Sequence, residues 1–231
     1  MSRTLIVLAR APSAAGKSRL TAGLTPDAAR EVREALFLDT LDAARGSGEP
    51  VTVCFTPDDA RDEMAALAGR LGPAGGDPGR TTFRPRFGPQ RGGDLGERMH
   101  AALADAVASG AASAILIGSD LPTLPPSRVA EAFAALDGGA DIVLGPTGDG
   151  GYYLVGLREP RPGVFADVPW GTSEVLDRTL ARSRTHRLRV SLVEPWHDVD
   201  DVEGVRRALA PVVDGVGRRT RVALIRAGII G

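Results

Sequence analysis

Short apolar runs alternate along this chain with segments whose apolar residues recur at helical spacing. Strands are predicted over residues 4–12, 51–55, 113–119, 140–146, 151–157 and 187–193, and more weakly over 81–87. Helices are predicted over residues 26–44, 58–71, 95–109, 125–136, 171–183 and 201–212. Strands that are apolar on both faces are typical of parallel sheets covered by helices. We therefore expect a three-layer α/β/α fold with a mainly parallel, doubly wound sheet, in one domain spanning residues 1–231.

In such a sheet, ligands bind beyond the carboxyl ends of the strands. The first of these exits reads "ARAPSAAGKSRL". Its small residues let a phosphate chain approach the backbone, and two cations can neutralise that chain. We assign nucleotide binding here to Ala9, Arg10, Ala11, Lys17 and Arg19. A P-loop is excluded because Ala11 stands where its first glycine would be, and a solvated basic loop is the alternative.

The second exit, "IGSDLPTL", runs a buried strand into Ser119 and Asp120. Pro122 keeps the following backbone extended. A carboxylate at this edge suits Mg²⁺, which would bridge phosphate oxygens of a nucleotide bound beside Ser119. Alternatively, Asp120 caps the next helix, although Thr123 and Ser127 are better placed to do so.

Two glycine-rich loops can fold closely against a ligand. In "GPTGDGGYY", Asp149 could orient a hydroxyl group of the donor or acceptor, and a hairpin turn is compatible with that role. In "GPQRGGDLGERM", Gln90 could pair with the edge of a base while Gly92 and Gly93 contact its plane. For Asp94 we prefer a helix cap.

The last exit, "PWHDVDDVEGV", concentrates three acids before a helix. One acid, Asp200 or Asp201, is enough to cap that helix. Asp198 and Asp200 lie two residues apart, so they point to the same side of an extended segment. Together with Asp120 they predict a Mg²⁺ site, with Mn²⁺ as the alternative ion.

Composition narrows the function classes. The chain has 28 Lys and Arg against 29 Asp and Glu, a balance that argues against a nucleic-acid partner. Cys54 is the single cysteine and the chain has three histidines, so we expect a buried thiol, no intrachain disulfide and no structural zinc. No run approaches the ~18 apolar residues of a membrane span, and the apolar stretch at the N-terminus is too short for a signal peptide. A cytoplasmic protein without a membrane partner is expected.

The C-terminal segment "VALIRAGIIG" is apolar for a chain end. We expect it to dock on the domain or on a second subunit, which would make a homodimer.

The segments "GGDLGERM", "GSDLPTL", "GPTGDGGYYLVGL", "PWGTSEVL" and "HDVDDVEGV", in this order, resemble the GT-A-fold nucleotide-diphospho-sugar transferases. The resemblance is greatest to an uncharacterised bacterial branch labelled as glycosyltransferases. "GKSRL", "SDLP" and "DVDD" are also similar to the phospholactate and molybdenum-cofactor guanylyltransferases. The resemblance implies that Lys17 and Arg19 contact phosphates and that Gln90 and Gly93 contact the base. It also implies that Asp120 and the acids of "DVD" hold the metal.

Two transferase reactions and one non-enzymatic role remain open. A nucleotidylyltransferase would move NMP from a nucleoside triphosphate to a small acceptor bearing a phosphate or carboxylate, using Lys17, Arg19 and Mg²⁺ to position and neutralise charge. A glycosyltransferase would use a nucleotide-diphosphate sugar and a base such as Asp149. Pro122 stands where such enzymes usually carry a second acid, so we rank nucleotidylyl transfer first. A catalytically inactive nucleotide-binding subunit is the third reading.

Overall fold

The computed structural model of the protein describes residues 2–14, 18–72, 83–209 and 217–231. Its strands form one sheet in the order β3-β2-β1-β4-β6-β5-β7. They are β1 (Arg3–Arg10), β2 (Val51–Thr56), β3 (Arg86–Pro89), β4 (Ser113–Ile117), β5 (Ile142–Pro146), β6 (Tyr152–Leu157) and β7 (Val190–Leu192). The strand β6 runs antiparallel to β4 and β5, and the other neighbouring strands pair in parallel. The predicted mainly parallel α/β fold is confirmed.

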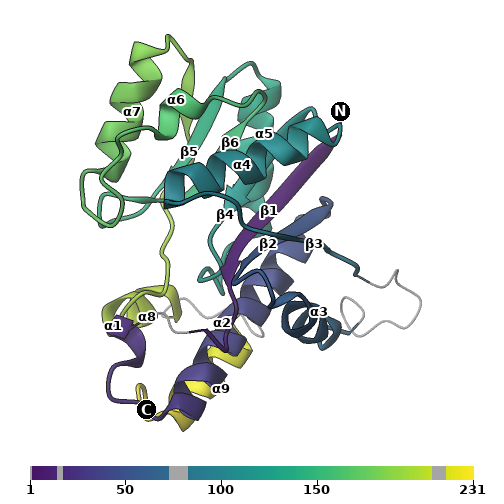
Figure 1. Cartoon of the computed structure of the whole chain (residues 1–231). Helices are drawn as coiled ribbons and strands as arrows, with labels where there is room; N and C mark the ends of the chain where they lie inside the picture. Colours follow the sequence, from purple (N-terminus) through teal and green to yellow (C-terminus); the bar gives the residue numbers. More distant parts are fainter. Residues whose placement is uncertain (1, 15–17, 73–82, 210–216) are drawn as a thin grey trace.

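Helices cover both faces of this sheet (Figure 1). In the described residues they are α1 (Ser18–Thr21), α2 (Pro26–Gly46), α3 (Arg61–Gly69), α4 (Leu95–Ala108), α5 (Pro126–Asp137), α6 (Pro162–Phe165), α7 (Val175–Thr185), α8 (Val202–Leu209) and α9 (Arg218–Arg226). Side chains alternate along β1: Leu5 and Val7 pack with α2, α3 and α5, whereas Ile6 packs with α4 and α6. The runs predicted to be apolar on both faces are therefore buried between two helix layers.

A third apolar cluster lies at the end of α2, where Figure 1 shows α1, α8 and α9 gathered. It joins residues far apart in the sequence, among them Leu20 of α1, Val32 of α2, Val199 and Leu224 of α9. The predicted docking of the C-terminal segment on the domain is confirmed, because Leu224 is fully buried there. The homodimer stays a prediction.

Several local predictions need correction. The strand predicted at 81–87 begins only at Arg86, since Pro85 has no N–H to donate to a ladder; residues 81–82 lie outside the described ranges. The helix α5 has Pro125 at its N-cap and no side-chain cap, so the capping role given to Thr123 or Ser127 is wrong. The helices α1, α6 and α9 were not predicted.

Cys54 is buried in β2, as predicted, and burial raises the pKa of its thiol to about 11. Among the helices of the described ranges, none combines the length and the apolar character needed to cross a membrane.

Candidate functional site

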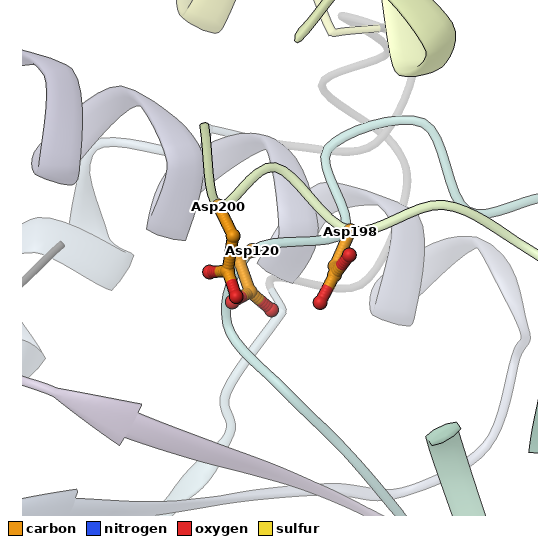
Figure 2. A group of neighbouring side chains, drawn as sticks. All are labelled: Asp120, Asp198 and Asp200. Atoms are coloured by element: carbon orange, nitrogen blue, oxygen red, sulfur yellow. The ribbon is translucent and has the colours of Figure 1, made fainter. Parts of the chain in front are cut away.

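Three aspartates from two distant segments meet beyond the carboxyl end of β4. One carboxylate oxygen from each of Asp120, Asp198 and Asp200 lies within 4.8 Å of the other two. Figure 2 shows the three side chains directed into the same space. Oxygen ligands about 2.1 Å from a Mg²⁺ ion lie roughly 3–4 Å from one another, so this arrangement fits a divalent cation with little movement. The predicted convergence of these acids is confirmed.

The turn after β4 brings the Asp120 carboxylate back over the strand end. A Cβ atom at Gly118 would lie 2.6 Å from Oδ1 of Asp120, so the carboxylate can occupy this position only beside a glycine. The backbone carbonyl of Asp120 accepts a hydrogen bond from the amide of Val199 at 3.0 Å. That bond ties the two acid-bearing segments together.

The second segment alternates between site and core. Val199 is fully buried in the third apolar cluster, while Asp198 and Asp200 on either side of it face the site. The next acid, Asp201, serves the helix instead: its Oδ1 accepts a hydrogen bond from the amide of Gly204 at 2.7 Å at the start of α8. The predicted cap is confirmed: of the two candidates, Asp201 caps α8, and Asp200 lies at the site.

Arg19 of α1 lies beside these acids. Its Nη2 lies 3.2 Å from Oδ2 of Asp200. The hydroxyl of Thr147 donates a hydrogen bond to Asp149 at 2.5 Å and, as the largest cause, holds the pKa of that carboxyl below its usual value; the positive charge of Arg19 adds to the shift. A carboxylate with a lowered pKa is a weaker base, which disfavours Asp149 as a general base. Lys17 lies outside the described residues.

A pocket of about 340 Å³ opens beside the aspartates, at the ends of β1, β2, β4 and β6. The predicted site residues that line it are Ala9, Arg10, Gln90, Ser119, Asp120 and Asp198. Arg98 of α4 also lines it and was missed by the sequence analysis. Its Nε donates a hydrogen bond to the carbonyl of Gly92 at 3.1 Å. The sequence signal for Arg98 was its place in the first turns of the helix that follows the glycine-rich loop.

Other predicted nucleotide-binding residues are engaged with the protein itself. Nε2 of Gln90 donates to the carbonyls of Ala9 (2.8 Å) and Cys54 (3.1 Å), which leaves its Oε1 for a ligand. The amide of Gly93 donates to Glu97 at 2.6 Å, and Asp94 caps α4 as predicted.

The remaining assigned residues do not line this pocket. Within the described residues these are Ala11, Arg19, Gly92, Gly93, Asp149 and Asp200. The roles assigned to them, a metal ligand for Asp200, catalysis for Arg19 and Asp149 and nucleotide binding for the others, stay predictions.

Residues 40–172 match the model of a protein family described as "Uncharacterized protein conserved in bacteria (DUF2064)". The chain belongs to this family. A search of curated proteins found no match for it.

Solved structures place this DUF2064 protein among the nucleotide-diphospho-sugar transferase folds. A candidate nucleotide-diphospho-sugar transferase from Desulfovibrio desulfuricans G20 is 30% identical, with a TM-score of 0.81 over 98% of this chain and 95% of that one. A CMP:2-keto-3-deoxy-manno-octonic acid synthetase complexed with CTP is 13% identical, with a TM-score of 0.53 over 91% and 99%. Rv0371c from Mycobacterium tuberculosis H37Rv, in complex with manganese, is 20% identical, with a TM-score of 0.51 over 92% and 100%. The last two likenesses concern the fold alone.

Proposed function

We propose that this protein is a Mg²⁺-dependent nucleotidylyltransferase that moves NMP from a nucleoside triphosphate to a small acceptor bearing a phosphate or carboxylate. The observation that carries the proposal is the convergence of Asp120, Asp198 and Asp200 beside a 340 Å³ pocket at the carboxyl edge of the sheet. Three carboxylates held this close favour positive charge beside them, part of which Arg19 supplies at Asp200. Mn²⁺, the ion named for the Rv0371c structure, is the alternative to Mg²⁺.

In this proposal the three aspartates hold the metal, which when bound neutralises charge on the triphosphate. Arg19, which is paired with Asp200 at the same edge, turns toward the phosphates. Lys17 is assigned a contact with the phosphates as well. The nucleotide rests along Ala9 and Arg10, which line the pocket. Ala11, the third residue assigned here, is fully buried. An acceptor oxygen attacks the α-phosphorus, the bond from that phosphorus to the bridging oxygen of the β-phosphate breaks, and pyrophosphate leaves. The chemistry demands position and charge neutralisation more than a protein base.

Glycosyl transfer is the second candidate. It is favoured by the Desulfovibrio relative, which is described as a candidate nucleotide-diphospho-sugar transferase. It is disfavoured by Asp149, the proposed base, whose pKa is lowered by its hydrogen bond from Thr147. A catalytically inactive nucleotide-binding subunit ranks third.

Ligand binding and product analysis separate these three functions. Thermal unfolding is measured with Mg²⁺ or Mn²⁺ plus each nucleoside triphosphate or, separately, UDP-glucose and GDP-mannose. A triphosphate at a hundred times its Kd stabilises the protein by about 2.7 kcal/mol. Stabilisation by triphosphates, with pyrophosphate release when phosphorylated acceptors are supplied, supports the proposal. Stabilisation by a nucleotide-sugar alone supports glycosyl transfer, and binding without turnover supports the inactive subunit.

Asp120→Asn tests the metal site directly. The amide offers one neutral oxygen in place of a carboxylate, so Mn²⁺ affinity, followed by electron paramagnetic resonance, is expected to fall at least about tenfold. Asp167→Asn is the matched control, because that side chain is 87% exposed and the left-handed backbone at this position suits asparagine. Equal Mn²⁺ affinities for the wild type and Asp120→Asn would contradict the assignment.

A further inference from the structure

One peptide group, between Asp120 and Leu121, is hydrogen-bonded at both ends. Its carbonyl oxygen accepts from the amide of Val199 at 3.0 Å. Its N–H donates to Oγ1 of Thr40 at 2.9 Å. Because a peptide group is planar and rigid, fixing both ends fixes its orientation and the Cα atom of Asp120. Val199 lies between Asp198 and Asp200, so this one group links α2 to both acid-bearing segments.

Thr40 is unusual for its place in α2. It is fully buried in the interior of a helix whose inner face is otherwise mainly apolar. Its hydroxyl oxygen accepts the hydrogen bond from the Leu121 amide, and Leu121 is itself fully buried. Water therefore cannot replace the hydroxyl, and losing it leaves a buried N–H without an acceptor.

Asp39, the residue before Thr40 on α2, binds α9, which packs against the loop that follows Asp120. Asp39 is buried and accepts hydrogen bonds from the amide of Thr220 at 2.7 Å and from Arg219 at 3.0 Å. These bonds tie α9 to α2. At the start of α9, a Cβ atom at Gly217 would lie 3.1 Å from Cγ2 of Thr123, three residues after Asp120. The loop is thus enclosed between α2 and α9, which keeps the Thr40 hydroxyl in reach of the Leu121 amide.

We propose that Thr40 is a positioning residue of the metal site, acting through the Asp120–Leu121 peptide group. The inference rests on the proposed function, because it assumes that the three aspartates bind a divalent cation. Thr40 contacts neither metal nor nucleotide. It sets the direction in which Asp120 leaves the backbone, and with Val199 it sets the spacing between Asp120 and the acids on either side of Val199. Loss of a residue that orients a metal ligand typically lowers metal affinity by about 10–100-fold.

Thr40→Val tests the proposal in the full-length chain, with Mn²⁺ as the probe. Valine keeps the shape and removes the acceptor, so Mn²⁺ affinity measured by electron paramagnetic resonance is expected to fall about 10–100-fold. Thr40→Ser keeps the hydroxyl and is expected to bind within roughly threefold of the wild type. Thr179→Val is the matched control: Thr179 is also fully buried in a helix, α7, and its hydroxyl donates to the carbonyl of Val175 at 2.9 Å. Thr179→Val should keep the Mn²⁺ affinity of the wild type.

The outcomes separate this inference from the proposed function. A wild-type chain that binds no Mn²⁺ overturns the metal site itself. Mn²⁺ affinity that is equal in the wild type and Thr40→Val, or lowered equally in Thr40→Val and Thr179→Val, overturns the positioning role alone.

A measurement on the wild type decides the matter if Thr40→Val does not fold. The Leu121 amide is expected to exchange with solvent about tenfold more slowly when Mg²⁺ saturates the site, because a metal that fixes Asp120 also holds the Thr40 hydrogen bond closed. An exchange rate that Mg²⁺ leaves unchanged counts against the proposal.

Discussion

Gly118 shows how one missing side chain can set the geometry of a site. The Asp120 carboxylate lies where a Cβ atom at residue 118 would approach Oδ1 to 2.6 Å, well inside van der Waals contact. The carboxylate is the end of a side chain, so an added methyl group would displace it instead of unfolding the chain. A substitution here changes the position of one metal ligand and little else.

Gly118→Ala is therefore expected to weaken Mn²⁺ binding by about tenfold or more while unfolding in urea close to the wild type. Gly69→Ala is the matched control, because a Cβ atom there has no other atom within 4 Å and α3 ends at that residue. It should leave both Mn²⁺ affinity and stability nearly unchanged. A Gly118→Ala protein that binds Mn²⁺ like the wild type would show that the carboxylate does not need this position.

At the residue scale, the sequence predicted the acids of the site but not the side chains that hold them. Asp120 and Asp198 were predictable because each follows an apolar strand whose carboxyl end faces the ligand edge. Thr40 was not, since a threonine inside a helical pattern carries no signal of its distant partner Leu121. Gln90 was read as a base contact, yet its amide nitrogen bridges the backbones of β1 and β2, a pairing that only the sheet order reveals.

At the element scale, the short edge strand β7 delivers the second acid-bearing segment to the site. It has three residues and pairs with β5. Beyond it, the amides of Val193 and Trp196 donate to the carbonyls of Leu144 (3.0 Å) and Pro146 (3.1 Å), which keeps the chain against β5. At its start, Asp141 accepts hydrogen bonds from the amide (2.8 Å) and Nε (3.2 Å) of Arg189.

This contact gives a pH-dependent prediction. The hydrogen bonds from Arg189 hold the pKa of Asp141 below its usual value, and its side chain is 25% exposed. A carboxyl whose pKa is lower in the folded state stabilises the fold above its unfolded pKa of about 3.9 and loses that contribution as the pH falls through the folded value. Asp141→Asn is expected to cost about 1 kcal/mol at pH 7 in urea unfolding, and nothing relative to the wild type near pH 2.

The exposed Asp58 provides the control for this pH dependence. Asp58→Asn should follow the wild type at both pH values. A stability difference between Asp141→Asn and the wild type that persists unchanged in acid would mean that the effect is not ionic.

Elements with strong apolar patterns were predicted best. The strands β2, β4 and β5 begin within two residues of their predicted starts, because each is a short apolar run between turn residues. The helix α9 was missed because its sequence, RRTRVALIR, is rich in arginine and only Thr220, Ala223 and Leu224 are buried. Its partner Asp39 on α2 lies 181 residues before Thr220 in the sequence, so no local pattern predicts the contact.

At the scale of the whole molecule, the third apolar cluster connects the C-terminal helix with both sides of the site. Leu20 follows Arg19 directly, Val199 separates two of the aspartates, and Leu224 of α9 is fully buried in the same cluster as both. The acid-bearing segments of the site are therefore packed on the third apolar cluster, which is distinct from the two clusters on the faces of the sheet. Packing in the third apolar cluster is expected to affect metal binding, whereas packing under α4 is not.

Leu224→Ala and Leu103→Ala test this difference with the same chemical change. Leu103 is 1% exposed and belongs to the cluster under α4. Each substitution leaves a cavity and is expected to cost about 2–5 kcal/mol in urea unfolding. Loosening the cluster around Val199 frees the segment between Asp198 and Asp200, so Leu224→Ala should also bind Mn²⁺ several-fold more weakly, measured at a temperature where both variants are folded. Leu103→Ala should keep the wild-type Mn²⁺ affinity. If both variants keep the wild-type Mn²⁺ affinity, the backbone hydrogen bonds alone position the aspartates, and the third apolar cluster contributes only to stability.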